Sequence, residues 1–329
     1  VYPTIASQFN DPGVNWAFVN LCVRMARKLK LDESAWTPAL DTTLREPKSV
    51  ALIGATPKPG SVGAVLARNL LGGGFTGRLM LVNPHETSIA GAPSFQSIAE
   101  LPVDPDLAVV AIPAPAAPAA IAQLAARGCR AAVVISAGFG APDSALRQAM
   151  LDGARPHLMR IVGPNCLGFL SPAIGVNASF AHLSPAAGDI AFITQSGAIA
   201  TTMLDWAVGR GVGFSHLVSV GDMSDVDMGD LLDHLALDPA TRSILLYVET
   251  VTAARKFMSA ARIASRTKPV IVVKGGRSSA GAKAAQSHTG ALAGADAVYD
   301  AAFRRAGMLR VFELRDLFEA AAALASGVR

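Results

Sequence analysis

Short apolar runs alternate with longer segments of helical spacing from Ser49 onward. Runs of β-branched and aliphatic residues that end at glycine, proline or polar residues predict buried strands. Between them, apolar residues recur at intervals of three and four, which predicts helices. The first series predicts strands at 49–54, 78–83, 106–112, 131–136 and 161–166. Strands that alternate with helices predict βαβ units and a parallel sheet that binds its ligand at the carboxyl ends of the strands.

A second series follows residues 171–188, a segment with proline and glycine that predicts a boundary. We expect strands at 189–194, 215–220, 243–249 and 269–274, and helices at 197–210, 226–237, 252–266, 289–306 and 313–326. This pattern predicts a second doubly wound domain of flavodoxin-like type. The predicted fold class is therefore α/β, with a Rossmann-like domain at 48–170 followed by a flavodoxin-like domain at 171–329.

Residues 1–47 form an N-terminal extension to which we assign no role. The segment from Asn15 to Lys30 has apolar residues at helical spacing and a basic end that complements a helix dipole. A basic amphipathic helix fits a membrane or partner surface, and it fits equally a helix packed on its own domain. Pro38 and Pro47 bracket a predicted linker.

Composition narrows the class of protein. Hydrophobic residues make up 51% of the chain and charged residues 16%, which suits parallel strands buried on both faces and argues against disorder. The formal net charge of +4, without a long basic run, gives no reason to expect nucleic acid. The apolar stretch 107–126 is interrupted by prolines, and the N-terminus lacks a charged region before an apolar one. Neither a membrane span nor a signal peptide is expected.

The cysteine pattern points to a reducing compartment. The three cysteines lie far apart without a CxxC pair, which supports neither a disulfide framework nor a zinc site; they are Cys22, Cys129 and Cys166. We therefore expect a cytoplasmic protein without a metal site of its own.

A glycine-rich turn follows the first predicted strand. Gly54, Gly60 and Gly63 do not form GxGxxG, because the first interval is too long. A glycine-rich turn from strand to helix still presents N–H groups to a phosphate, although a purely structural turn also fits. An NAD protein places Asp or Glu at the end of the second strand, where this chain has Asn83 and Pro84. That difference argues against NAD and favours a nucleotide with phosphate on its ribose, such as coenzyme A or NADP.

A second anion site is predicted at Gln195, Ser196 and Gly197, between a strand and a helix. A hydroxyl and the N–H groups of a helix N-terminus stabilise an anion there, although Ser196 also fits an ordinary N-cap. Glu249 ends another strand and His288 precedes an alanine-rich helix after a loop of small residues. Because carboxyl ends of parallel strands share one edge of a sheet, Glu249 and His288 are expected to meet.

His288 is a candidate nucleophile. Neutral imidazole attacks phosphorus near pH 7, and a carboxylate on its other nitrogen holds the tautomer and stabilises a phosphorylated ring. Taken alone, the same position also fits a helix cap or a solvated loop residue.

Several longer stretches occur in one order along residues 48–327. They are SVALIGATPKPGSVG, LVNP, AVVISAGFG, GPNCLG, ITQSGAIA, SVGDMSDVDMGDLL, LYVE, KPVIVVKGGRSSAGAKAAQSHTGALAG and YDAAFRRAGMLRV. Together they resemble the ADP-forming acyl-CoA synthetases and, more distantly, the alpha subunit of succinyl-CoA synthetase.

The resemblance implies that 48–170 binds coenzyme A and that His288 becomes phosphohistidine, with Glu249 as its orienting carboxylate. Gln195, Ser196 and Gly197 would cradle the phosphoryl group, and Arg277 would belong to the histidine loop. The implied coenzyme A contacts are Gly54, Ala55, Thr56, Ser61 and Gly63 at the phosphates, Asn83, Pro113, Ser136, Ala137 and Gly138 along the nucleotide, and Asn165 and Cys166 near the thiol. In this family the cysteine is not the residue that is phosphorylated.

The implied reaction is that of an acid–CoA ligase (ADP-forming). Phosphate attacks an acyl-CoA, the acyl phosphate phosphorylates His288, and the phosphohistidine converts ADP and Mg²⁺ to ATP; acetate or another short-chain acid is expected. No ATP-grasp domain is recognisable before Arg329, so an ATP-grasp partner domain or beta subunit is expected to supply the nucleotide site, and the protein is expected to be an oligomer.

Two departures leave an alternative open. Asp222 stands where many synthetases have asparagine, and SVGDMSDVDMGDLL is most similar to members fused to an acetyltransferase. The alternative is an acyl-CoA-sensing regulatory domain of a protein acetyltransferase. An NADP-dependent oxidoreductase is a weaker third hypothesis, because no acid–base set for hydride transfer accompanies the glycine turn.

Overall fold

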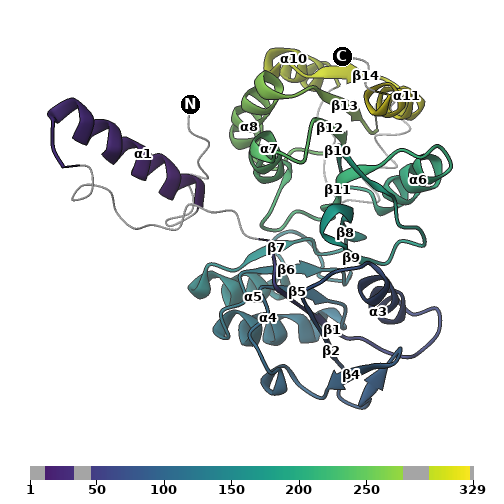
Figure 1. The fold of residues 1–329 in the computed structure, drawn as a ribbon. Coiled ribbons are helices and arrows are strands. Elements are labelled where there is room, and N and C mark those ends of the chain that lie inside the picture. The colour runs from purple at the N-terminus through teal and green to yellow at the C-terminus, as the bar shows by residue number, and fades with distance from the viewer. Residues whose placement is uncertain (1–11, 33–45, 277–295, 327–329) are drawn as a thin grey trace. The chain divides into compact units, whose positions relative to one another are not determined.

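The computed structural model describes residues 12–32, 46–276 and 296–326. The chain divides into two compact units, Val1–Glu46 and Pro47–Arg329. The first unit contains the helix α1 (Pro12–Leu29), which ends with Arg27 and Lys28 and confirms the predicted basic helix (Figure 1). Within the described ranges, no helix is both long and apolar enough to cross a membrane.

The first sheet of the second unit is built around the strand β1. Its strand order is β3-β4-β2-β1-β5-β6-β7, and β1 pairs in parallel with β2 and β5. The predicted strands are confirmed, while the short β3 and β4 at one edge were not predicted. The strands are β1 (Ser49–Ile53), β2 (Arg78–Val82), β3 (Ser88–Ile89), β4 (Ala92–Phe95), β5 (Leu107–Val110), β6 (Ala131–Val134) and β7 (Arg160–Val162).

Helices cover both faces of this sheet (Figure 1). Ala51 and Ile53 pack with α4 (Ala117–Ala126) and α5 (Ala145–Ala154). Val50 and Leu52 point to the other face and pack with α3 (Val62–Gly72). Successive residues of a strand point to opposite faces, so an unbroken apolar strand requires helices on both sides. Short 3₁₀ turns complete the region at η1 (Ile98–Glu100), η2 (Ala114–Ala116), η3 (Arg155–His157) and η4 (Pro172–Ile174).

The second sheet has the strand order β14-β13-β12-β10-β11-β8-β9. Its centre is parallel and buried, and β8 pairs with β11 in the antiparallel direction. The strands are β8 (Gly168–Ser171), β9 (Val176–Ser179), β10 (Ala187–Thr194), β11 (Phe214–Ser219), β12 (Ser243–Val248), β13 (Val270–Lys274) and β14 (Leu309–Val311).

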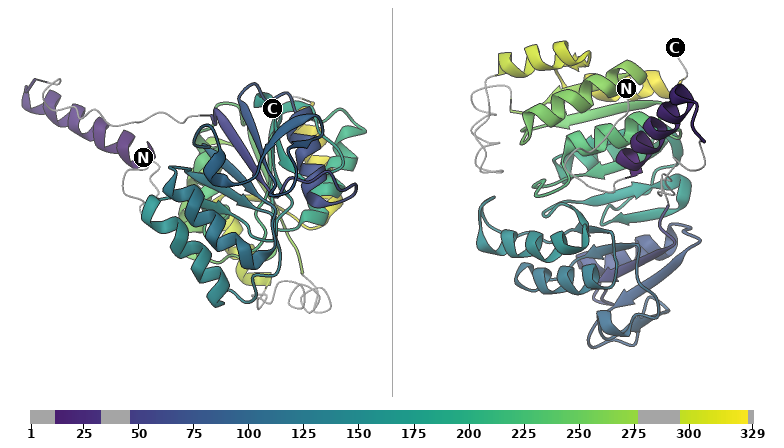
Figure 2. Two further views of the ribbon diagram at one scale, coloured as in Figure 1. Left: turned by 90° about the horizontal axis from the view of Figure 1, so that it is seen from below. Right: turned by 90° about the vertical axis from the view of Figure 1, so that its left-hand side faces the viewer.

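Two groups of helices enclose this second sheet, and Figure 2 shows them above the helices of the first. On one face pack α7 (Met228–Leu237), α8 (Ala254–Thr267) and α10 (Asp296–Ala306). On the other face pack α6 (Gly197–Val208) and α11 (Leu314–Ala325). The predicted α/β fold class, with a Rossmann-like and a flavodoxin-like part, is confirmed.

The hairpin β8–β9 connects the two sheets in a way that the sequence did not indicate. Asn69 on α3 donates through Nδ2 to the carbonyl oxygens of Ser179, at 2.9 Å, and Ala181, at 2.8 Å. Val176 and Ala178 of β9 belong to the same buried cluster as Leu66 and Leu70 of α3. The domain boundary that we predict after residue 170 falls inside β8, a strand of the second sheet.

Candidate active site

The turn from β1 to α3 brings backbone into very close contact. Gly54 has a φ of 95°, and a Cβ there would lie 2.5 Å from the carbonyl oxygen of Ala111. A Cβ at Gly63 would lie 2.2 Å from the carbonyl oxygen of Gly54. Only glycine fits either position, because real Cβ atoms do not approach backbone oxygens so closely. The first turn of α3 is thereby held against the carboxyl end of β1, a geometry that can present helix N–H groups to a phosphate.

Hydroxyl groups organise the rest of this turn. Ser61 is the N-cap of α3: its Oγ accepts from the backbone N–H of Ala64 at 3.3 Å and donates to the carbonyl oxygen of Lys58 at 2.7 Å. The Oγ1 of Thr56 accepts from the N–H of Lys58 at 3.3 Å. The sequence-predicted residues Gly54, Ala55, Thr56, Ser61 and Gly63 thus form one connected turn.

The position of Asn83, just after β2, requires an amide side chain and not a carboxylate. Its Nδ2 donates to the carbonyl oxygen of Ala55 at 2.7 Å, and its Oδ1 accepts from the N–H groups of His85 at 2.8 Å and Glu86 at 3.1 Å. A carboxylate accepts but does not donate, so an aspartate would lose the bond to Ala55. The absence of an acidic residue here therefore has a structural cause as well as a bearing on the ligand.

The ends of β5 and β6 present two further loops beside the glycine turn. Pro113 begins the turn η2, and Ser136 donates through Oγ to the carbonyl oxygen of Ile112. Ala137 and Gly138 are exposed, while Phe139 is buried with 2% exposure and anchors the loop. Gly138 has a φ of 94°, a conformation that glycine adopts without strain.

Asn165 and Cys166 have different environments despite being neighbours. Asn165 is exposed, with a φ of 58°, and its N–H donates to the carbonyl oxygen of Ser136 at 2.9 Å. Cys166 is 4% exposed, packs in the core beside α3, and its Sγ lies 3.3 Å from the carbonyl oxygen of Val134. Burial raises the pKa of the Cys166 thiol to about 12. The expected place of Cys166 near the thiol of coenzyme A remains a prediction, and its buried side chain leaves such a contact to the backbone.

The buried thiols are expected to resist alkylation. Burial raises the pKa of Cys129, as of Cys166, to about 12, so the reactive thiolate is scarce in both near pH 8. Iodoacetamide at pH 8 should modify the partly exposed Cys22 first, and should reach the other two only after denaturant is added. Mass spectrometry of tryptic peptides measures this; rapid labelling of Cys166 in the native chain would contradict the buried position.

A second cluster forms where β10 and β12 end. Ser196 caps α6 by accepting from the N–H of Ile199 at 3.3 Å, and its own N–H donates to the Oγ1 of Thr194 at 3.0 Å. The Oε1 of Gln195 accepts from the N–H groups of Glu249, at 2.5 Å, and Thr250, at 2.9 Å. Its Nε2 donates to the Oγ1 of Thr250 at 3.1 Å. One amide side chain thus holds the backbone of Glu249 beside the N-terminus of α6.

Lys274, at the end of β13, was not singled out in the sequence. It is 4% exposed, its Nζ lies 4.8 Å from the ring centre of Tyr299, and it donates to the carbonyl oxygen of Gly275. Burial lowers the pKa of Lys274, against the opposing effect of Asp296 and Glu249. Lys274 is thus a buried cation near Asp296 and Glu249, and Asp296 also forms an ion pair with the buried Arg310. The predicted nucleophile His288 and the loop residue Arg277 lie outside the described residues.

The aspartates of the stretch 222–230 form ion pairs and a helix cap. Asp222 and Asp225 form ion pairs with Arg147 and Arg160, and Asp227 caps α7. Asp230 pairs with Arg160 at 3.2 Å and with Lys256 at 2.8 Å. Over the residues that the structure describes, no group of three or more histidine, cysteine, aspartate or glutamate side chains is arranged to bind a metal ion.

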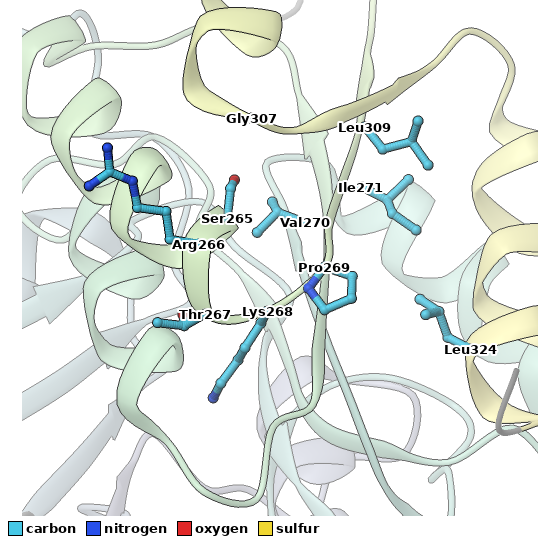
Figure 3. Close-up of a pocket in the computed structure, with 10 residues that line it drawn as sticks. All are labelled: Ser265, Arg266, Thr267, Lys268, Pro269, Val270, Ile271, Gly307, Leu309 and Leu324. Carbon is cyan, nitrogen blue, oxygen red and sulfur yellow. The ribbon is translucent and has the colours of Figure 1, made fainter. Parts of the chain in front are cut away.

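A cavity of about 500 Å³ lies at the opposite end of β13 (Figure 3). Pro269, just before that strand, and its first residues Val270 and Ile271 line the cavity, with Leu309 and Leu324 across from them. Lys268 points away and donates to the carbonyl oxygens of Leu235 and Asp238. Because the two clusters above lie at the carboxyl ends of the strands, this cavity is separate from the candidate active site.

Comparison with known proteins finds a matching family model for each of the two domains. Residues 48–172 match the family model for a CoA binding domain, and residues 187–324 match that for a succinyl-CoA ligase like flavodoxin domain. The chain is 42% identical over 276 residues to acetate–CoA ligase [ADP-forming] I of Archaeoglobus fulgidus, covering 83% of this chain and 40% of that protein. It is 40% identical over 290 residues to acetate–CoA ligase [ADP-forming] I subunit alpha of Pyrococcus furiosus, covering 86% and 63%.

A solved structure shows the same arrangement. The dinucleotide-forming acetyl-coenzyme A synthetase 1 of Ca. Korarchaeum cryptofilum, in complex with phosphate and ADP, superimposes with a TM-score of 0.81 at 35% identity. The match covers 85% of this chain and 61% of that one, so the chain spans less than two thirds of the length of these relatives.

The fold and the two clusters define a two-domain protein of the succinyl-CoA ligase type, with a CoA-binding domain and a flavodoxin-like domain. The chain belongs to the ADP-forming acyl-CoA synthetase family, as the resemblance implied.

Proposed function

We propose that this chain is the alpha-type portion of an NDP-forming acyl-CoA synthetase. It interconverts acyl-CoA, phosphate and ADP with carboxylic acid, coenzyme A and ATP through an acyl phosphate and phospho-His288. The observation that carries the proposal is the Gln195 amide, which holds the backbone of Glu249 beside the capped N-terminus of α6. That arrangement holds the backbone of a glutamate next to a helix end suited to an anion, which fits phosphoryl transfer to histidine.

Coenzyme A is assigned to the first sheet. The turn 54–63 receives its phosphates at the N-terminus of α3, and the loops at Asn83, Pro113 and 136–138 line the rest of the nucleotide. Asn165 lies next to Ser136 and leads toward the second sheet. These assignments are supported by the match to the CoA binding domain and by the continuous backbone contacts of the loops.

Phosphate is assigned to Gln195, Ser196 and Gly197. A phosphate oxygen attacks the thioester carbonyl, the C–S bond breaks, and coenzyme A leaves as the thiol after taking a proton. A nitrogen of His288 then attacks the phosphorus of the acyl phosphate, and the P–O bond to the carboxylate breaks. Glu249 orients the imidazole, while the N–H groups of α6 balance the negative charge of the phosphoryl group.

The last step, phosphoryl transfer to ADP, needs a nucleotide site that we assign to a partner. ADP and Mg²⁺ would bind an ATP-grasp domain or beta subunit, where the phosphoryl group of His288 passes to ADP. The name of the Pyrococcus furiosus relative, a subunit alpha, supports this division, and we expect an oligomer. Acetate or another short-chain acid is the proposed substrate, since relatives are named acetate–CoA ligases. A cytoplasmic location remains our expectation from the unpaired cysteines.

A labelling experiment tests the proposal directly. The purified chain is incubated with acetyl-CoA and radiolabelled phosphate, and the stability of the protein-bound label to acid and alkali is followed. An acid-labile, alkali-stable label is expected, because the P–N bond of phosphohistidine hydrolyses in acid. If coenzyme A binds but no label forms, even with an ATP-grasp partner present, the enzyme proposal fails and an acyl-CoA-sensing domain of a protein acetyltransferase becomes the better hypothesis.

The structure offers that alternative no specific support. The stretch SVGDMSDVDMGDLL suggested it, and its four aspartates are used in ion pairs and a helix cap. These contacts serve a sensor and an enzyme equally. The labelling result therefore decides between the two.

A further inference from the structure

A buried arginine on a helix of the first sheet contacts a turn of the second sheet. Arg147 lies on α5 and is 5% exposed. Its Nη2 donates to the Oδ2 of Asp222 at 2.7 Å and to the carbonyl oxygen of Gly140 at 2.9 Å. Gly140 closes the loop 136–140, whose exposed residues we assign to coenzyme A. One guanidinium therefore ties that loop to the turn after β11.

Asp222 also holds the second loop on the coenzyme A side. Its Oδ1 accepts from the Nδ2 of Asn165 at 3.1 Å, and its backbone N–H donates to the carbonyl oxygen of Pro164 at 2.9 Å. The N–H of Asn165 in turn donates to the carbonyl oxygen of Ser136. The contacts form a closed ring through Arg147, Asp222, Asn165 and the loop 136–140.

The main chain determines where the Asp222 carboxylate stands. Gly221 has a φ of 54°, and a Cβ there would lie 2.3 Å from the carbonyl oxygen of Pro164. Ser224 and Val226 donate their N–H groups to the carbonyl oxygens of Gly163 and Ile161, each at 3.0 Å. Backbone contacts thus hold the segment 221–226 along 161–165. They fix the main chain from which the Asp222 side chain extends.

The same turn is connected to the phosphate cradle. The N–H of Val220 donates to the carbonyl oxygen of Thr194 at 2.9 Å, and the Oγ1 of Thr194 accepts from Ser196. The Oγ of Ser219 accepts from the N–H of Leu167 at 3.1 Å. Asp222 therefore stands between the loops assigned to coenzyme A and the residues assigned to phosphate.

We propose that Asp222 and Arg147 are positioning residues that hold the loops 136–140 and 163–166 in register with the phosphate cradle, so that the thioester meets the bound phosphate. The inference rests on the proposed function. The carboxylate neutralises the guanidinium of Arg147, because a buried guanidinium without its partner is strongly unfavourable. Asparagine at this position would keep an acceptor for Arg147 but not the charge.

Variants of Asp222 in the full chain test this role. Asp222→Ala is expected to weaken coenzyme A binding about tenfold or more, because two hydrogen bonds to a charged group are lost. Asp222→Asn should weaken it roughly threefold, since one hydrogen-bond acceptor remains. In the labelling reaction, the KM for acetyl-CoA should rise with Asp222→Ala while the KM for phosphate stays within about twofold. Isothermal titration calorimetry measures the affinity, and thermal unfolding reports whether each variant is folded.

Asp225→Ala is the matched control. Asp225 pairs with Arg160 at 3.0 Å and accepts from the N–H of Ile161 at 2.7 Å, so it also links the two sheets. Its hydrogen bonds go to Arg160 and Ile161, and not to the loop 136–140 or to Asn165. It should lower the unfolding temperature and leave coenzyme A affinity unchanged.

Three outcomes would overturn the inference. The first is an unchanged coenzyme A affinity in Asp222→Ala. If the alanine variant does not fold, an unchanged affinity in Asp222→Asn counts instead. An equal loss of affinity in Asp225→Ala would show a general effect of linking the sheets. If the unchanged chain does not bind coenzyme A, the proposed function fails first and the inference falls with it.

Discussion

A Glu249→Gln variant is expected to form phosphohistidine about a hundredfold more slowly than the unchanged chain, or slower still. The backbone N–H groups of Glu249 and Thr250, and not the carboxylate, are what Gln195 binds. Glutamine therefore leaves the clamp intact and removes the negative charge that would orient His288 and stabilise its phosphorylated form. Rapid-quench measurement of the acid-labile label with acetyl-CoA and radiolabelled phosphate gives the rate.

Two controls bracket this result. His288→Ala should take up no acid-labile label and sets the baseline. Glu319→Gln makes the same chemical change on α11, where Glu319 is mostly exposed and pairs with Arg315 at 2.8 Å. It should label at the unchanged rate. A normal rate in Glu249→Gln would remove this carboxylate from the mechanism, and a normal label in His288→Ala would mean that another residue carries the phosphoryl group.

A Gly63→Ala variant is expected to lose coenzyme A binding and to unfold at lower temperature. The new Cβ would lie 2.2 Å from the carbonyl oxygen of Gly54, so either the start of α3 or the end of β1 must move. Overpacking against backbone of this kind costs roughly 3 kcal/mol of unfolding free energy. The displaced helix end would no longer present its N–H groups to the phosphates, and we expect affinity to fall by about two orders of magnitude.

The same helix supplies the matched control. Gly72 ends α3, and a Cβ there meets nothing within 4 Å. Gly72→Ala should therefore bind coenzyme A normally and gain up to about 1 kcal/mol of stability, since alanine loses less backbone entropy in a helix. Calorimetric titration and thermal unfolding of both variants make the comparison. If Gly63→Ala binds as tightly as Gly72→Ala, the turn is not where the phosphates lie.

The buried parallel strands of both sheets could be predicted because their pattern is local. β1 and β13 are short, unbroken apolar runs that end at glycine or at a polar residue followed by glycine. The strand β9 (Val176–Ser179) has no such pattern, since Asn177 and Ser179 alternate with small apolar residues. Its burial comes from packing against α3, more than a hundred residues earlier in the chain. Tertiary contacts of this range leave no periodicity to detect.

The candidate active site also combines short-range features, which could be predicted, with long-range contacts, which could not. The cap at Ser196 and the tight turn at Gly54 and Gly63 are short-range features, and residue type and spacing indicated both. Gln195 reaches Thr250 across 55 positions, and Arg147 reaches Asp222 across 75. Neither partner could be inferred from neighbouring residues. Lys274 was overlooked because a lysine at a strand end is usually solvated, and its burial under Tyr299 depends on α10.

The hairpin β8–β9 determines where chimeras between relatives can be joined. The strand β9 is buried against α3 although it belongs to the second sheet, and Asn69 extends that contact to Ala181. A crossover between residues 170 and 176 would combine α3 from one parent with β9 from another and mismatch a shared core. The connection between Ala181 and the start of β10 at Ala187 avoids this. A graft between relatives should therefore keep the core of α3 and β9 intact when the splice lies in that connection.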